Sequence, residues 1–62
     1  MAWIAVDKDG TEVVYGDKPE RDASVGVWDT PEPNQYWVIL PKGSIKKLIG
    51  RSLTWEDECI EL

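Results

Sequence analysis

Four cationic side chains are the residues best suited to chemistry in this chain, because they fall within ten residues that contain no acid: Lys42, Lys46, Lys47 and Arg51. Ammonium and guanidinium groups bind phosphate and carboxylate oxygens, and neighbouring Trp and Tyr rings can stack on nucleotide bases. The sequence therefore predicts an anion-binding or partner-binding surface at these four residues. The alternative interpretation is that they form the solvated outer face of a short amphipathic helix.

The other reactive residue types do not combine into a catalytic or metal site. The chain has no His and one Cys, Cys59, which excludes a Cys-His or Ser-His pair within one chain. Acidic neighbours raise the pKa of the Cys59 thiol and make it a poor nucleophile. The consecutive acids Glu56, Asp57 and Glu58 point to alternate sides of an extended chain and cannot converge as an acid–base pair. We expect no catalytic residue, no metal, no cofactor and no enzyme activity.

The segment Asp7-Lys8-Asp9-Gly10 suggests either a tight turn or a calcium loop. An EF-hand loop needs a third ligand before its glycine and a Glu at its twelfth position, which here is Lys18. The segment is therefore predicted to be a turn between two strands.

Length and charge narrow the class of protein. At 62 residues the chain forms one domain, residues 1–62, near the lower size limit for folding alone. The net charge is −5, and an acidic chain binds nucleic acid and anionic membranes poorly. No apolar run approaches the ~18 residues of a membrane span, and the first residues lack a signal-peptide pattern. We expect a cytoplasmic protein that contacts no membrane.

Two β-rich runs flank the Asp-Gly turn, which predicts a hairpin between Trp3–Val6 and Thr11–Tyr15. With Gly10 in the left-handed conformation, the register follows from the turn length. The predicted pairs are Asp7 with Thr11, Ala5 with Val13, Ile4 with Val14, and Trp3 with Tyr15.

One stretch has a helix signal from start to stop, and it predicts a helix at about 44–49. Ser44 is a suitable N-cap, Gly50 suits the left-handed position after the last turn, and three apolar residues share one face: Ile45, Leu48 and Ile49. Lys46 and Lys47 are placed in the first turn, where they oppose the helix dipole unless an anion binds there.

Five consecutive β-formers, Tyr36–Leu40, carry apolar side chains on both faces. Such a strand is typical of the middle of a sheet, so we expect it to be central and covered by the helix. Gly16–Ser24 is expected to be a solvated connection, and Val25–Trp28 a short strand. Leu53–Trp55 is expected to form another, separated by a bulge or turn at the acidic triplet from a last segment, Cys59–Leu62.

The fold class predicted from these elements is mainly β (α+β): a small antiparallel sheet or half-open barrel of four or five strands with one short helix. Because one helix covers only one face of a sheet, the strands with two apolar faces also predict a twofold homodimer. The competing interpretation is that the sheet curls enough to wrap its own Trp side chains, as small barrels do. In that dimer the Lys42–Arg51 stretch is expected to meet the acidic first half of a second copy.

Three stretches, Trp3–Glu12, Leu40–Gly50 and Leu53–Glu58, resemble short uncharacterised proteins of gut bacteria and their phages or mobile elements. The resemblance implies a compact accessory module and supplies no site residue. We therefore predict a small protein-interaction module, accessory to a phage or mobile element. The alternatives are a nucleic-acid-binding protein that uses the four cations, and an acidic nucleic-acid mimic that binds a host protein.

Overall fold

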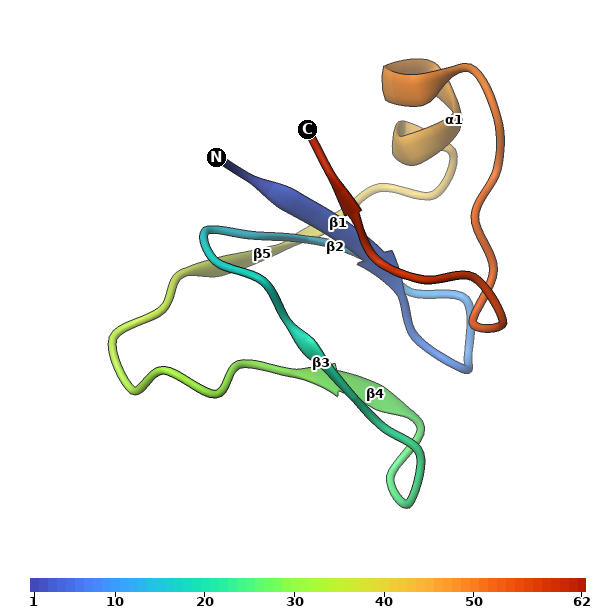
Figure 1. The fold of residues 1–62 in the computed structure, drawn as a ribbon. Helices are drawn as coiled ribbons and strands as arrows, with labels where there is room; N and C mark the ends of the chain where they lie inside the picture. Colours follow the sequence, from blue (N-terminus) through green and yellow to red (C-terminus); the bar gives the residue numbers. More distant parts are fainter.

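The computed structural model describes all 62 residues and contains six strands and one helix. Their bounds are β1 (Trp3–Val6), β2 (Glu12–Tyr15), β3 (Glu20–Asp22), β4 (Val27–Asp29), β5 (Trp37–Leu40), α1 (Ser44–Ile49) and β6 (Ile60–Glu61). Four strands form an antiparallel sheet in the order β5-β2-β1-β6, and β3 and β4 form a separate hairpin. Helix α1 lies on one side of the sheet and the β3–β4 hairpin on the other (Figure 1). The mainly β class with one short helix is confirmed, with six strands in two sheets.

The β1–β2 hairpin has the predicted register. Ala5 lies opposite Val13, Ile4 opposite Val14 and Trp3 opposite Tyr15. At the turn, the Asp7 N–H donates to the Thr11 carbonyl oxygen at 2.9 Å, and Gly10 has a φ of 93°. The positive φ explains why Gly occupies the last turn position.

The core lies on both faces of β1 and β2. On the helix side, one cluster of buried side chains joins Ile4, Val6, Ile45 and Leu53. On the hairpin side, a second cluster joins Ala5, Val13, Tyr15 and Trp28. The alternation of side chains along a strand sends neighbours into different clusters, so β1 and β2 are the central strands.

The prediction that Tyr36–Leu40 is the central, covered strand is wrong. Strand β5 is the outermost strand of the sheet and pairs only with β2. The predicted alternation is correct, because Trp37 lies opposite Tyr15 on the hairpin side and Val38 opposite Val14 on the helix side. The cover is missing: α1 and the β3–β4 hairpin lie over β1 and β2 and leave β5 exposed. Of the three apolar residues predicted to share one face of the helix, Ile45 is buried, whereas Leu48 is 57% exposed.

Helix α1 has the predicted bounds but a different cap. Gly43, with a φ of 91°, precedes the helix, and no side chain of the adjoining residues caps it. The Ser44 hydroxyl instead donates to the Pro41 carbonyl oxygen at 2.6 Å. Lys46 and Lys47 lie in the last turn, where cations favour the helix dipole, so their placement in the first turn is corrected. At six residues, the helix is far too short to cross a membrane.

The segment Gly16–Ser24, expected to be a plain connection, contains β3 and its Arg21. The Arg21 guanidinium lies over the Trp28 ring at 4.8 Å and over the Trp55 ring at 5.1 Å. It also donates to the carbonyl oxygens of Trp55 at 3.0 Å and Asp57 at 2.7 Å. Through these contacts β3 holds the chain that leads to β6.

In the C-terminal segment, the strand predicted at Leu53–Trp55 is not formed. Instead, Leu53 belongs to the buried cluster on the helix side, and Trp55 packs against the cluster on the hairpin side. The acidic triplet forms the expected turn, in which the Asp57 carboxylate accepts the Thr54 N–H at 2.8 Å.

Candidate functional site

The free edge of β5 exposes backbone hydrogen-bonding groups. Just beyond the strand, the Gly16 N–H donates to the Tyr36 carbonyl oxygen at 2.9 Å, in the same register that pairs Val14 with Val38 and Glu12 with Leu40. In an antiparallel ladder, the residues that bond a given neighbour alternate along the strand. The N–H and C=O groups of Trp37 and Ile39 therefore point away from β2, where the sheet ends.

The side chains of this edge are apolar and exposed: Tyr36 84%, Trp37 53%, Val38 58% and Ile39 58%. Natural sheets commonly protect an edge with charge, proline, a bulge or a very short strand. The opposite edge of this sheet is protected, because β6 has only two residues and one of them is Glu61. Residues 36–40 contain no charge and no proline, so β5 is an unprotected edge.

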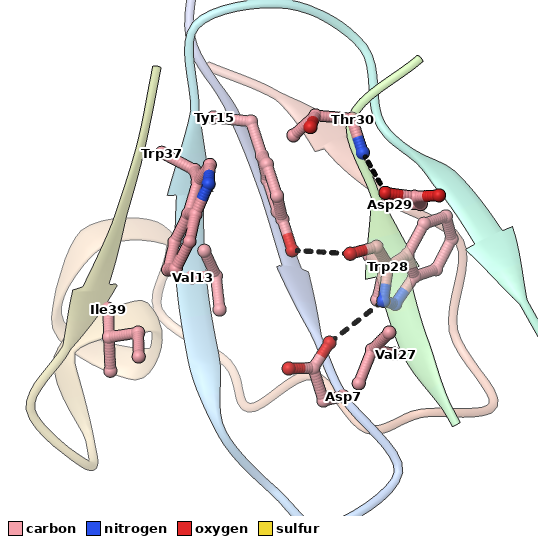
Figure 2. Close-up of a pocket in the computed structure, with 9 residues that line it drawn as sticks. All are labelled: Asp7, Val13, Tyr15, Val27, Trp28, Asp29, Thr30, Trp37 and Ile39. Atoms are coloured by element: carbon pink, nitrogen blue, oxygen red, sulfur yellow. Dashed lines mark hydrogen bonds between the residues drawn. The ribbon is translucent and has the colours of Figure 1, made fainter. Parts of the chain in front are cut away.

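An apolar cleft of about 280 Å³ lies beside β5 on the hairpin side of the sheet. Figure 2 shows its parts: Val13 and Tyr15 of β2 form the floor, Trp37 and Ile39 of β5 stand on one side, and β4 stands on the other. From β4, Val27 and Trp28 line the cleft, and the Trp28 carbonyl oxygen faces Tyr15. The open edge and the cleft thus share the exposed faces of Trp37 and Ile39.

Two carboxylates border this cleft, Asp7 and Asp29, and both accept hydrogen bonds from the chain itself. Asp7 accepts the Trp28 N–H at 2.9 Å, and Asp29 accepts the Thr30 N–H at 2.8 Å. Partial burial raises the pKa of Asp7 from its usual value, against the lowering effect of the Trp28 hydrogen bond, and the nearby charge of Asp9 raises it further.

Tyr15 in the floor of the cleft has a strongly raised pKa because it is buried and because the Asp7 and Asp29 charges disfavour a phenolate. Its hydroxyl donates to the Trp28 carbonyl oxygen at 3.5 Å. The Trp28 indole N–H in turn donates to the Val6 carbonyl oxygen at 2.9 Å. These bonds fix β4 over β1 and β2, so the cleft is a preformed apolar surface with two acids at its border.

The four predicted cations lie elsewhere and are all exposed: Lys42, Lys46, Lys47 and Arg51. Lys42 shares a shallow depression with Asp9 and Glu12, whose negative charges offset its own. The N-terminus of α1 is already occupied, because the Glu12 carboxylate accepts the Gly43 N–H at 2.7 Å and the Ile45 N–H at 2.8 Å. The structure therefore gives these cations no preformed anion pocket, and an anion-binding role for them stays a prediction.

Sequence reasoning identified the apolar run of β5 but not its position at the edge. The run gave no signal of an edge, because five apolar residues without a protecting charge are typical of a central strand. The half-buried thiol of Cys59 has a raised pKa, caused mainly by burial and further by the Glu58 charge, against the lowering effects of Lys18 and Arg21. No group of three or more Cys, Asp and Glu residues is arranged to hold a metal ion.

Comparisons with protein-family models, with curated proteins and with solved structures find no match to this chain.

Proposed function

We propose that the chain is a small protein-interaction module that binds an extended segment of a protein partner as an added strand along β5. The observation that carries this proposal is the unprotected edge, where Trp37 and Ile39 direct free backbone groups outward from an apolar strand. In strand addition, main-chain hydrogen bonds supply affinity and the alternating side chains supply specificity.

The cleft gives such a partner a place for side chains. A strand added to β5 sends every second side chain toward the hairpin side, beside Trp37, Ile39 and the cleft. An apolar side chain fits the Val13 and Tyr15 floor, and the border acids favour a basic residue next to it. The preferred partner segment is therefore extended, apolar where it faces the cleft, and free of acids.

A cytoplasmic location and an accessory role in a phage or mobile element are part of the same proposal. The first carries forward the expectation drawn from the sequence, and the second rests on the resemblance of three stretches of the sequence to short proteins of that type. An interaction module without its own catalytic chemistry suits an accessory role.

The test uses a chain of 62 residues made by chemical synthesis, with a methyl group on the backbone nitrogen of Ile39. This methyl group removes one outward N–H and blocks an approaching strand, while every side chain is kept. Peptides selected from a random displayed library against the unmodified chain are then titrated into both forms at low protein concentration. We expect the selected peptides to be extended and to bind the unmodified chain at least about tenfold more tightly than the methylated chain. A factor of this size corresponds to the loss of one good hydrogen bond together with steric exclusion by the methyl group.

The proposal is wrong if no peptide is selected, or if the selected peptides bind both forms equally. Equal binding would mean that side-chain contacts in the cleft, without strand addition, account for the affinity. Circular dichroism of the methylated form checks that the fold is kept.

A further inference from the structure

We infer that the partner of β5 is a second copy of this chain, joined by antiparallel pairing of the two β5 strands about a twofold axis. This inference rests on the proposed function, because it names the strand that the edge accepts. The segment Tyr36–Leu40 is complementary to itself, both in its outward backbone groups and in its side chains.

The outward backbone groups restrict the register. Only Trp37 and Ile39 of β5 direct N–H and C=O groups outward, so bonded pairs must be made between these two positions. If Trp37 pairs with Ile39 of the second copy, symmetry repeats the pair, and each pair exchanges two N–H···O bonds, about four in all. The twofold axis then passes beside Val38, which lies opposite Val38 of the second copy.

In this register every apolar residue of the segment meets another apolar residue. Trp37 lies opposite Ile39 on the hairpin side, and on the helix side Tyr36 lies opposite Leu40 and Val38 opposite Val38. Aromatic and β-branched cross-strand pairs of this type stabilise antiparallel sheets.

The two neighbouring registers fit less well. A shift of two residues in one direction places Ile39 opposite Gln35 and Leu40 opposite Asn34. The opposite shift places Trp37 opposite Pro41, which has no N–H to donate. The register centred on Val38 is therefore the one that the sequence of the strand favours.

Charge agrees with the antiparallel direction. Lys42 follows the end of β5, while the surface around Gln35, just before its start, contains two acids, Asp17 and Glu32, and one base, Lys18. Antiparallel pairing brings Lys42 of each copy toward this surface of the other, where the acids outnumber the single base, so the charges are compatible with this orientation. This replaces the contact expected from sequence between the whole Lys42–Arg51 stretch and the acidic first half of the chain.

The paired strands form one eight-stranded sheet in which both copies of α1 lie on one side and both β3–β4 hairpins on the other. Ile39 of each copy then stands beside Trp37 of the other, so each cleft is extended by a side chain of the second copy. Stable complexes bury about 1,200–2,000 Å² in total, and a pairing of five residues per chain lies at or below the lower end of that range. We therefore expect a dissociation constant on the order of 10–100 µM.

The test is sedimentation equilibrium from low micromolar to near-millimolar protein, with charge variants at the axis. Val38→Lys and Val38→Glu each place two like charges directly opposite each other, so either variant alone is expected to be monomeric. An equal mixture of the two is expected to dimerise, because Lys then faces Glu. Val25→Lys is the matched control: Val25 is 68% exposed in the β3–β4 turn, far from the edge, and this variant should dimerise like the parent.

Several results would overturn the inference: a parent chain that stays monomeric to near-millimolar concentration, single variants that dimerise like the parent, or a mixture that stays monomeric. The first of these, obtained together with peptide binding that the methyl group on Ile39 abolishes, would leave strand addition intact and exclude only self-pairing. Because Val38 is more than half exposed, the variants are expected to fold, and their circular dichroism spectra check this.

Discussion

The Glu12 carboxylate accepts a 2.8 Å hydrogen bond from the backbone N–H of Ile45 and so connects the second strand of the sheet to the first turn of the helix. The other carboxylate oxygen accepts the Gly43 N–H at 2.7 Å. A side chain 33 positions away in the sequence thus serves the helix start that Ser44 does not cap.

Removal of this carboxylate should weaken the attachment of α1. Glu12→Ala leaves two backbone N–H groups without their partner in a partly buried place, and we expect a loss of about 2 kcal/mol in the free energy of unfolding. Glu12→Gln keeps one acceptor oxygen and should lose about half as much. Urea denaturation measures both. The control is Glu20→Ala, at an exposed acid of β3, and an equal effect of the two Ala variants would show that the cap does not contribute.

The two cleft tryptophans should respond differently to the same substitution. Trp28 is 8% exposed and donates its indole N–H to the Val6 carbonyl oxygen, so Trp28→Ala should cost about 3–5 kcal/mol, comparable to the stability of the whole domain. Trp37 is half exposed at the edge, and Trp37→Ala should cost about 1 kcal/mol or less in dilute solution. Thermal unfolding at low micromolar concentration compares them. If Trp37→Ala is the more harmful change, β5 is covered after all and the fold described above is wrong there.

The pKa values of two acids in the same turn, Asp7 and Asp9, should be shifted in opposite directions. Partial burial, the leading cause, raises the pKa of Asp7 above its usual 3.8, whereas hydrogen bonds from Thr11 lower that of Asp9. Carbon-13 NMR of the carboxyl groups measures both values. A pKa for Asp7 at or below that of Asp9 would contradict the burial of Asp7 between the turn and β4.

The sign of each shift predicts how stability changes with pH. Asp7 stabilises the fold most when protonated, and this contribution is lost as pH rises through its raised pKa. Asp7→Asn keeps an acceptor for the Trp28 N–H, so the variant should gain stability relative to the parent between about pH 3 and pH 7. Asp9 acts oppositely: its contribution is present above its unfolded pKa and is lost as pH falls through the lowered value, so Asp9→Asn should lose stability at pH 7 but not near pH 2.

Elements whose structure depends on neighbouring residues could be predicted from the sequence. The Asp-Gly turn fixes the register of β1 and β2, and Gly50, with a φ of 80°, ends the helix where the sequence predicts it. Long-range partners were not predictable in the same way. Arg21 has only charged or polar neighbours in the sequence, yet it lies over two Trp rings and bonds a distant segment.

Strand β5 shows why the candidate site could be located only from the structure. An apolar pattern records that side chains favour burial, but it does not say whether the same chain covers them. In residues 1–62 the helix and the hairpin lie over β1 and β2, and neither lies over β5. The two-faced apolar strand that the sequence places in the centre of a sheet would reach such a position when another strand pairs with its free edge.

Amide hydrogen exchange along β5, followed by NMR at two protein concentrations, tests this account most directly. In dilute solution, the N–H groups of Val38 and Leu40 bond β2 and should exchange at least about tenfold more slowly than the outward N–H groups of Trp37 and Ile39. Near millimolar concentration, Trp37 and Ile39 should become protected as a second β5 adds to the edge. Slow exchange at Trp37 and Ile39 in dilute solution would contradict the open edge, and fast exchange there at both concentrations would contradict its pairing with a second copy.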